Sequence, residues 1–224
     1  MIKVLDHGHV RLVDHMGSDL SVVRSARVSY NAEPRNDGSD AKLIHYLWKN
    51  RHTTPFESVS FTFDVKAPIF VFRQWHRHRT WKYNEMSARY TELPEEFYVP
   101  RPEDIGVQSE KNKQQRVIGE VTEKQKQLSN EIWIACTAAH KQYRLLIKEG
   151  CPRELARGVL PVNTYSHMFA SVDLHNLFHF LRLRLHPHAQ YEIRVYAEAM
   201  LELIRPIVPT CVAAFELQLV NPGA

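Results

Sequence analysis

Apolar and polar side chains alternate along several parts of the chain in ways that predict strands. Residues 61–67 alternate with a period of two, as a half-buried strand does, until Pro68 interrupts the pattern. The run 69–72 is continuously apolar, which we interpret as a strand covered on both faces. Residues 2–13 and 163–172 are also expected to be extended.

Apolar residues at three- and four-residue spacing predict helices elsewhere. We expect helices at 19–27, 41–49, 123–149, 174–185 and 189–205. The expected N-caps are Ser18 and Asp40, and Thr122 with Gln125 forms a capping box. Residues 52–57 are expected to form a polar turn, and 91–120 a polar loop. The apolar stripe of the third helix is expected to comprise Leu128, Ile132, Ala135, Ala139, Tyr143 and Leu146. The predicted fold class is α/β of the α+β type, a largely antiparallel sheet packed with long helices.

Composition favours one soluble domain. The chain has 224 residues, 44% of them hydrophobic, which suits a single domain over residues 1–224. With 29 basic and 25 acidic residues, the net charge of +4 is too small for a general nucleic-acid coat. Its 3 cysteines have no CxxC spacing, so we predict a reduced protein in the cytoplasm. No signal peptide or membrane span is expected.

The segment 73–90 concentrates positive charge. Glu85 is its only acid, whereas its basic side chains are Arg73, His76, Arg77, His78, Arg79, Lys82 and Arg89. Arginine binds planar oxyanions in a bidentate manner, and the chain has no glycine-rich phosphate loop. Three interpretations fit: a solvated basic face, a pocket for a phosphorylated small molecule, and a nucleic-acid patch whose bases stack on Trp75, Trp81, Tyr83 and Tyr90. The predominance of arginine and the nearby Asn84 and Ser87 favour the pocket.

Two further features lie near the predicted helix 174–185. Arg184 falls on its apolar stripe and therefore needs a partner, unless its guanidinium reaches solvent at the helix end. Asp173, His175 and His179 have a D-x-H-x3-H spacing that can hold a metal. No flanking acid completes that set, so no metal is predicted. A metal-dependent hydrolase stays as a rival interpretation, beside the nucleic-acid-binding module.

Arg77, His78 and Arg79, followed after seven residues by Ser87, resemble the RHR-x7-S signature of the flavin-dependent thymidylate synthases. The similarity extends to Tyr83, Asn84, Glu85 and Arg89 and to segments 27–29, 52–57, 152–161 and 183–193, so it covers nearly the whole chain. The resemblance implies reductive methylation of dUMP to dTMP, with FAD as hydride source, NADPH as its reductant and methylenetetrahydrofolate as carbon donor. It also implies a homotetramer whose sites are shared between subunits.

The same resemblance implies roles for individual residues. Arg184 would face the uracil and stabilise negative charge on the ring. The residues expected to bind dUMP are Gln74, Trp75, His76, Arg77, Glu85, Met86, Ser87, Ala88, Arg89, Arg157 and Arg184. Those expected to bind FAD are Thr54, Arg77, His78, Arg79, Glu85, Asp173, His175 and His179. Ser87 is interpreted as a nucleotide ligand and not as a nucleophile, because no adjacent base is evident to activate it.

This sequence departs from the common family pattern at a few positions. Asn and Arg are frequent where it has Asp173, His175 and His179. Lys82 replaces a frequent serine, and Ala88 a frequent glycine. These differences concern the detailed contacts of the cofactor and the nucleotide.

Overall fold

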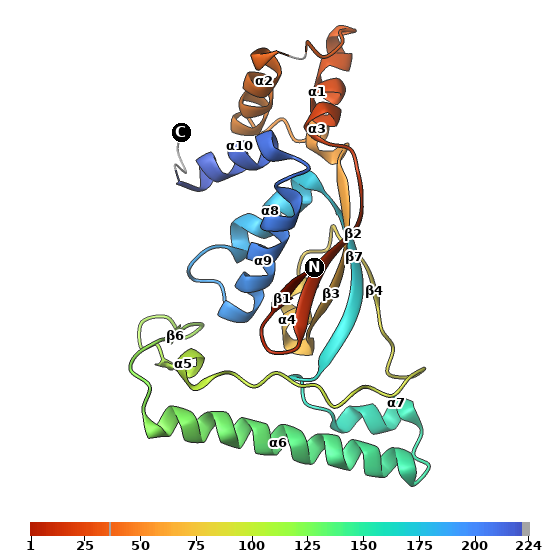
Figure 1. Cartoon of the computed structure of the whole chain (residues 1–224), viewed down its shortest axis with the longest axis vertical. Coiled ribbons are helices and arrows are strands. Elements are labelled where there is room, and N and C mark those ends of the chain that lie inside the picture. The colour runs from red at the N-terminus through yellow and green to blue at the C-terminus, as the bar shows by residue number, and fades with distance from the viewer. Residues whose placement is uncertain (36, 221–224) are drawn as a thin grey trace.

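A five-stranded antiparallel sheet forms the centre of the computed structural model, which describes residues 1–35 and 37–220. The strands lie in the order β1-β2-β3-β7-β4 (Figure 1). Their bounds are Ile2–Val4 for β1, Gly8–Met16 for β2, Ser60–Pro68 for β3, Lys82–Glu85 for β4 and Tyr165–Asp173 for β7. The predicted fold class, an antiparallel sheet packed with helices, is confirmed.

The pairing of β3 with β7 is the most regular part of the sheet. It runs without a register shift from Ser60 opposite Asp173 to Pro68 opposite Tyr165. By contrast, the pairing of β2 with β3 shifts register between Leu12 and Asp14. The strand β4 adds a short edge to β7, with Glu85 opposite Met168. The continuous ladder therefore fixes the positions of the elements attached to both of its ends.

One face of the sheet is covered by α4 (Ile69–Trp75), α8 (Leu174–Arg184) and α9 (Tyr191–Ile204), as Figure 1 shows. The alternating residues Phe61, Phe63 and Val65 are fully buried on this side. Trp75 stacks on Phe180 with a centroid distance of 4.9 Å. The residues between them in β3 face the other side, where the sheet remains partly exposed. The core therefore lies between the sheet and these three helices.

The prediction of a strand at 69–72 is wrong, because these residues begin α4. Pro68 has φ −60° and ψ 144° and is the N-cap of this helix. The free N–H groups of its first turn donate to the loop before β7, Ile69 to the carbonyl of Thr164 and Phe70 to that of Val162, both at 3.0 Å. The basic segment 73–90 therefore begins inside a helix and not at the tip of a strand.

A second group of helices packs at one end of the sheet (Figure 1). It comprises α1 (Asp19–Arg27), the 3-10 turn η1 (Val28–Tyr30), α2 (Gly38–Lys49), α3 (Thr54–Glu57) and α10 (Pro209–Val220). Trp48 joins these helices to α8, because its ring lies 5.1 Å from Phe178 and 6.0 Å from Phe215. Residues 54–57 are thus a short helix and not the expected turn.

The predicted caps are partly correct. Ser18 is the N-cap of α1. The N-cap of α2 is Asp37, whose carboxylate accepts a hydrogen bond from the Ser39 amide at 2.8 Å, so the assignment of Asp40 is wrong. Asp40 instead forms an ion pair with Arg27 at 2.5 Å, which ties α2 to α1. The helix begins three residues earlier than expected because a second aspartate there is able to cap it.

The segment between β4 and β7 is mostly irregular until a long helix. It contains α5 (Pro102–Ile105), the strand pair β5 (Val107–Gln108) and β6 (Arg116–Val117), and then α6 (Glu123–Lys148). The capping box is confirmed, since the Thr122 amide donates to Gln125 Oε1 at 3.1 Å. After Gly150, at φ 83°, the short helix α7 (Arg153–Ala156) and the turn η2 (Arg157–Val159) lead to β7.

The apolar stripe predicted for α6 is partly buried. Tyr143 is buried, Ile132, Ala139 and Leu146 are half-buried, and Leu128 and Ala135 are exposed. The exposed Trp133, Ile134 and Leu145 lie outside that stripe. Figure 1 shows α6 lying beyond the end of the sheet, away from α8 and α9. In residues 1–35 and 37–220 no helix is both long and apolar enough to cross a bilayer.

Candidate active site

Arg184 lies at the C-terminal end of α8 and is held by α4 and the segment that follows it. Its Nε donates to Nε2 of His78 at 3.1 Å, and its Nη2 donates to the backbone carbonyl of Gln74 at 3.2 Å. The expectation that an arginine on this apolar stripe has a partner is therefore met. Two bonds from separate atoms of one guanidinium fix its plane, which prepares it to meet a ligand in one orientation.

His78 is the neutral partner in this pair. Burial, together with the positive charges of Arg184 and His179, lowers the pKa of His78 from 6.5 to about 4. Its Nε2 accepts a bond from Arg184, so at neutral pH the ring carries its proton on Nδ1. Burial also lowers the pKa of Arg184, yet a guanidinium remains charged at any physiological pH. The site thus presents one positive charge beside an uncharged imidazole.

A chain of side-chain hydrogen bonds leads from Gln74 to the start of α9. The Gln74 amide donates to Gln190 Oε1 at 2.6 Å, and Gln190 donates to Glu192 at 2.8 Å. Glu192 is only 2% exposed and also accepts bonds from Tyr98 at 3.0 Å and from Arg116 at 2.9 Å. A carboxylate satisfied by these donors is well stabilised despite its burial.

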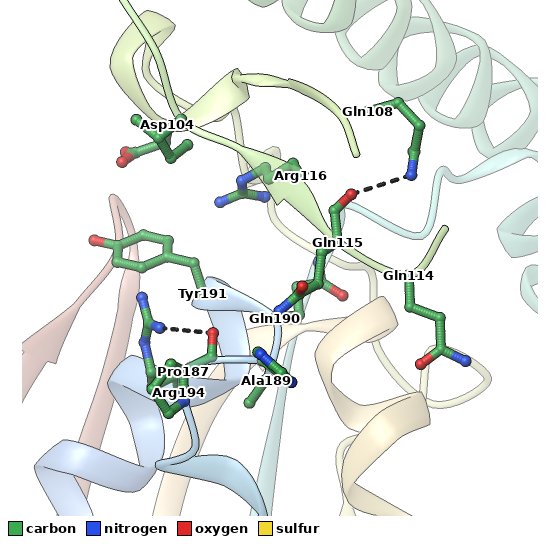
Figure 2. Close-up of a pocket in the computed structure, with 12 residues that line it drawn as sticks. Asp104, Gln108, Gln114, Gln115, Arg116, Pro187, Ala189, Gln190, Tyr191 and Arg194 are labelled. Carbon is green, nitrogen blue, oxygen red and sulfur yellow. Dashed lines mark hydrogen bonds between the residues drawn. The ribbon is translucent and has the colours of Figure 1, made fainter. Parts of the chain in front are cut away.

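Beside these hydrogen-bonded side chains lies a polar cleft of about 460 Å³ (Figure 2). One wall comes from α5, β5 and β6 and the other from the loop and helix at 187–194. Its lining residues are Asp104, Gln108, Gln114, Gln115, Arg116, Ile118, Pro187, His188, Ala189, Gln190, Tyr191 and Arg194. The Arg116 and Arg194 guanidiniums each lie 5.8 Å from the centre of the Tyr191 ring.

Several residues assigned to FAD line a second surface, which extends from His78 toward α3. The rings of His78 and His179 are 6.0 Å apart. His175 and His179 border a hollow of about 200 Å³, and Thr54 borders a further hollow of about 480 Å³. Both hollows share Thr53, so the two surfaces adjoin. Imidazole and hydroxyl groups can donate to the phosphate and carbonyl oxygens of a flavin nucleotide, so this set fits such a group.

Asp173 has a structural task that competes with the metal interpretation. It is the N-cap of α8, accepting from the Asn176 amide N–H at 2.9 Å and from its side chain at 2.7 Å. Within the described part of the chain, a set of side chains that could ligate a metal converges at His9, Asp64 and His167 and not at this spacing. The rival reading of a hydrolase built on Asp173, His175 and His179 therefore has no geometric support.

Several residues expected to bind dUMP lie at the edge of the sheet. Glu85 accepts a bond from Ser166 at 2.7 Å, and the Met86 amide donates to the His167 carbonyl at 2.8 Å. These contacts fix the start of the turn that carries Ser87 and the buried Ala88. The position of the turn is thus set by β7.

Two arginines expected to bind dUMP, Arg89 and Arg157, both contact Glu154 of α7. Arg89 lies 3.4 Å from the Glu154 carboxylate, and Arg157 Nε donates to the Glu154 carbonyl at 3.4 Å. Both arginines are exposed. Such weakly held guanidiniums are available to an anion, which would displace the surface ion pair at little cost.

The remaining residues of the basic segment divide by exposure. Arg77 and Arg79 are exposed on either side of the buried His78, and His76 contacts the Tyr83 ring at 4.7 Å. Trp75 is fully buried and Trp81 is 5% exposed, so neither ring is free to stack on a base. Tyr83 is half-buried and Tyr90 is exposed, so among the four aromatic rings of the nucleic-acid interpretation Tyr90 alone is fully open to a base. One open ring does not form a stacking surface for successive bases, so this interpretation is not favoured.

Comparison with known proteins identifies the family. The family model described as thymidylate synthase complementing protein matches residues 11–210. A flavin-dependent thymidylate synthase of Treponema denticola is 51% identical over 221 residues, covering 96% of this chain and 81% of that protein. One from Thermus thermophilus is 50% identical over 220 residues, covering 98% of this chain and 80% of that protein. The chain belongs to the flavin-dependent thymidylate synthase family.

A solved structure supports the same assignment for the fold. The UMP/dUMP methylase PolB from Streptomyces cacaoi, bound with 5-Br dUMP, superposes with a TM-score of 0.87 at 41% identity. The match covers 96% of this chain and 97% of that one. The resemblance stated from the RHR-x7-S signature is thus confirmed. In this flavin-dependent thymidylate synthase family member, the signature places a buried neutral histidine between two exposed arginines.

Sequence reasoning missed two parts of this arrangement. It gave no role to Arg116, which lies in a polar segment and meets Glu192 only through tertiary contacts. It also passed over Asp64, which binds Arg11 at 2.6 Å and His9 at 3.2 Å on the exposed face of the sheet. The one available signal was that Asp64 occupies a polar position of an alternating strand, where a buried carboxylate requires cross-strand donors.

Proposed function

We propose that this protein is a flavin-dependent thymidylate synthase that reductively methylates dUMP to dTMP. FAD is its bound cofactor, NADPH reduces that cofactor, and methylenetetrahydrofolate provides the carbon. The observation that carries the proposal is the half-buried Arg184 guanidinium fixed on the neutral His78 of the family signature. Family membership and the dUMP analogue bound by the similar methylase PolB support it.

In this proposal the two groups of cations hold opposite ends of dUMP. Arg89 and Arg157 bind the phosphate, with Ser87 and the backbone of Met86 and Ala88 as hydrogen-bonding partners. Arg184 and Gln74 face the uracil, flanked by the segment from Trp75 to Arg77. Loss of the N3 proton makes the ring an anion, which the fixed guanidinium stabilises because it needs no reorganisation at that moment.

The flavin would lie on the surface that joins the hollows near α3 to His78. Thr54, His175 and His179 provide hydroxyl and imidazole donors there, and Asp173 orients the helix that carries both histidines. Arg77, His78, Arg79 and Glu85 would border both the flavin and dUMP. When bound, FAD supplies the hydride that the methylation requires. The chain itself positions the nucleotide and keeps His78 uncharged.

We also propose a homotetramer with shared sites. Within one chain, Arg89 and Arg157 sit at the β4 edge and α7, whereas Arg184 sits on the helical face of the sheet, so a second chain would complete each site. The exposed Leu128, Trp133, Ile134 and Leu145 of α6 provide apolar surface for subunit contact.

The remaining expectations belong to the same proposal. Residues 1–224 would form one domain that acts in a reducing cytoplasm. Cys136, Cys151 and Cys211 are free thiols, which fits that compartment.

The test is to separate the two half-reactions in Arg184→Ala. Pure wild-type protein should show flavin absorbance and convert dUMP to dTMP with NADPH and methylenetetrahydrofolate. The variant should keep bound flavin and its reduction by NADPH, while dTMP formation falls about 10²–10³-fold, as when one preorganised donor is removed. Arg24→Ala, which removes an exposed arginine from α1, is the control and should behave as wild type. Undiminished dTMP synthesis in Arg184→Ala would refute the role, and colourless protein that binds RNA would refute the function.

A further inference from the structure

We propose that the polar cleft beside Gln190 binds the anionic tail of a co-substrate, with Arg194 as the residue that pairs with the anion. This inference rests on the proposed function and adds a subsite to it. Two co-substrates carry such a tail: the 2′-phosphate end of NADPH and the glutamate carboxylates of the folate. Both present an oxyanion remote from the reacting ring, which is the chemistry that the cleft recognises.

The cleft has the size and position for such a tail. Its volume of about 460 Å³ lies within the ~300–1,000 Å³ typical of small-molecule sites. It begins at Gln190, whose side chain binds that of Gln74, while the Gln74 carbonyl binds Arg184. A co-substrate whose reactive ring meets the uracil near Arg184 can therefore extend its far end past Gln190 into the cleft.

The charges in the cleft identify Arg194 as the anion-binding group. Arg116 pairs with the nearly inaccessible Glu192 at 2.9 Å, so its charge is already compensated. Arg194 instead faces an exposed carboxylate, Glu198, at 3.8 Å and donates to the Pro187 carbonyl at a long 3.4 Å. Since a screened surface pair of this kind contributes little, an incoming phosphate or carboxylate can take over the guanidinium.

The other cleft residues suit an anion as well. The acid in the cleft, Asp104, accepts a bond from Arg101 at 2.8 Å, which offsets its negative charge. The side-chain amides of Gln114 and Gln115 and the ring of His188 offer neutral donors around the opening. Figure 2 shows Arg116 and Arg194 near Tyr191 on the side of the cleft away from Gln114. The Tyr191 ring between these elements gives the guanidinium of Arg194 a flat surface that limits its motion.

The experiment measures steady-state constants for Arg194→Gln, a change that keeps hydrogen-bonding capacity but removes the charge. Tetramer content, flavin content, kcat and the KM for dUMP should match wild type. If the tail is the phosphate, the KM for NADPH should rise about tenfold or more while the KM for NADH stays the same. If it is the folate, the KM for triglutamyl methylenetetrahydrofolate should rise to that of the monoglutamate.

The control and the refuting outcome are separate from those of the proposed function. Arg24→Gln should leave every constant unchanged. An active Arg194→Gln enzyme whose KM values for NADPH and for triglutamyl folate both equal those of wild type would overturn the subsite. Wild-type protein that makes no dTMP would instead overturn the proposed function. The wild-type assay therefore comes first, and flavin-loaded wild type that forms dTMP shows that the proposed function holds.

Discussion

Acidification should weaken the fold through His78 in particular. In the folded chain the pKa of His78 is lowered to about 4 by burial and by the neighbouring Arg184 and His179, against 6.5 for the unfolded side chain. Below pH 6.5 the unfolded chain therefore binds a proton that the folded chain does not bind, so stability falls as the pH falls. Protonation at Nε2 would also remove the acceptor that holds Arg184 and place two cations in contact.

The size of the effect follows from the two pKa values. Between pH 8 and pH 5 this linkage should cost about 2 kcal/mol, since each pH unit below 6.5 and above 4 costs about 1.4 kcal/mol. For a chain of this length, about 2 kcal/mol lowers the melting temperature by about 4–8 °C. His78→Gln keeps an oxygen acceptor for Arg184 but cannot titrate, so its loss of stability over the same range should be smaller by this amount.

Urea unfolding followed by circular dichroism at pH 8 and pH 5, at one protein concentration, measures the difference. The rest of the chain is the same in both proteins, so its pH dependence cancels in the comparison. His15→Gln, which removes an exposed imidazole, is the matched control and should lose as much stability as wild type. Equal losses in wild type and His78→Gln would refute the neutral, buried assignment of His78.

Two further substitutions test the sheet. Gly8→Ala would place a Cβ 2.1 Å from the Tyr196 hydroxyl and 2.6 Å from the Val4 carbonyl. It should therefore destabilise the fold by about 1–3 kcal/mol, measured by thermal unfolding. Gly38→Ala, whose Cβ would have nothing within 4 Å, is the control and should not destabilise it. Asp64→Asn should cost about 1–2 kcal/mol at pH 7. Burial alone would raise the pKa of Asp64, but hydrogen bonds from Arg11 and two histidines outweigh it and lower the pKa. The stability that ionised Asp64 contributes is present above its unfolded pKa near 3.8 and is lost as the pH falls further. The free energies of unfolding of wild type and Asp64→Asn should therefore become equal in acid. A difference between them that does not change with pH would contradict the ion pairing.

Local chemistry made much of the fold predictable. Ser18, the Thr122 capping box and the alternation in β3 each depend on residues a few positions apart, and all three are found in the structure. The prediction of a strand at 69–72 failed because four apolar residues fit a buried strand and a buried helix equally well. The loop carbonyls of Val162 and Thr164 that satisfy its first N–H groups are distant in sequence.

In the candidate site, too, features set by nearby residues could be predicted and features set by tertiary contacts could not. Arg184 could be singled out from one sequence, because a cation on an apolar stripe demands a partner. That partner, His78, is distant in sequence, and its lowered pKa arises only when α4 and α8 pack together. The stripe of α6 is only partly covered in one chain, since periodicity shows that a face is apolar but not whether the same chain or another one covers it.

The unbroken ladder between β3 and β7 has a consequence for biosynthesis. Its two strands are separated by roughly 100 residues of chain, which a ribosome adds at about 5–20 residues per second. For about 5–20 s the nascent β3 has an unsatisfied edge toward its later neighbour, with Phe61, Phe63 and Val65 not yet sealed beneath α8 and α9. Newly made chains in this window are the ones most prone to aggregate through that edge.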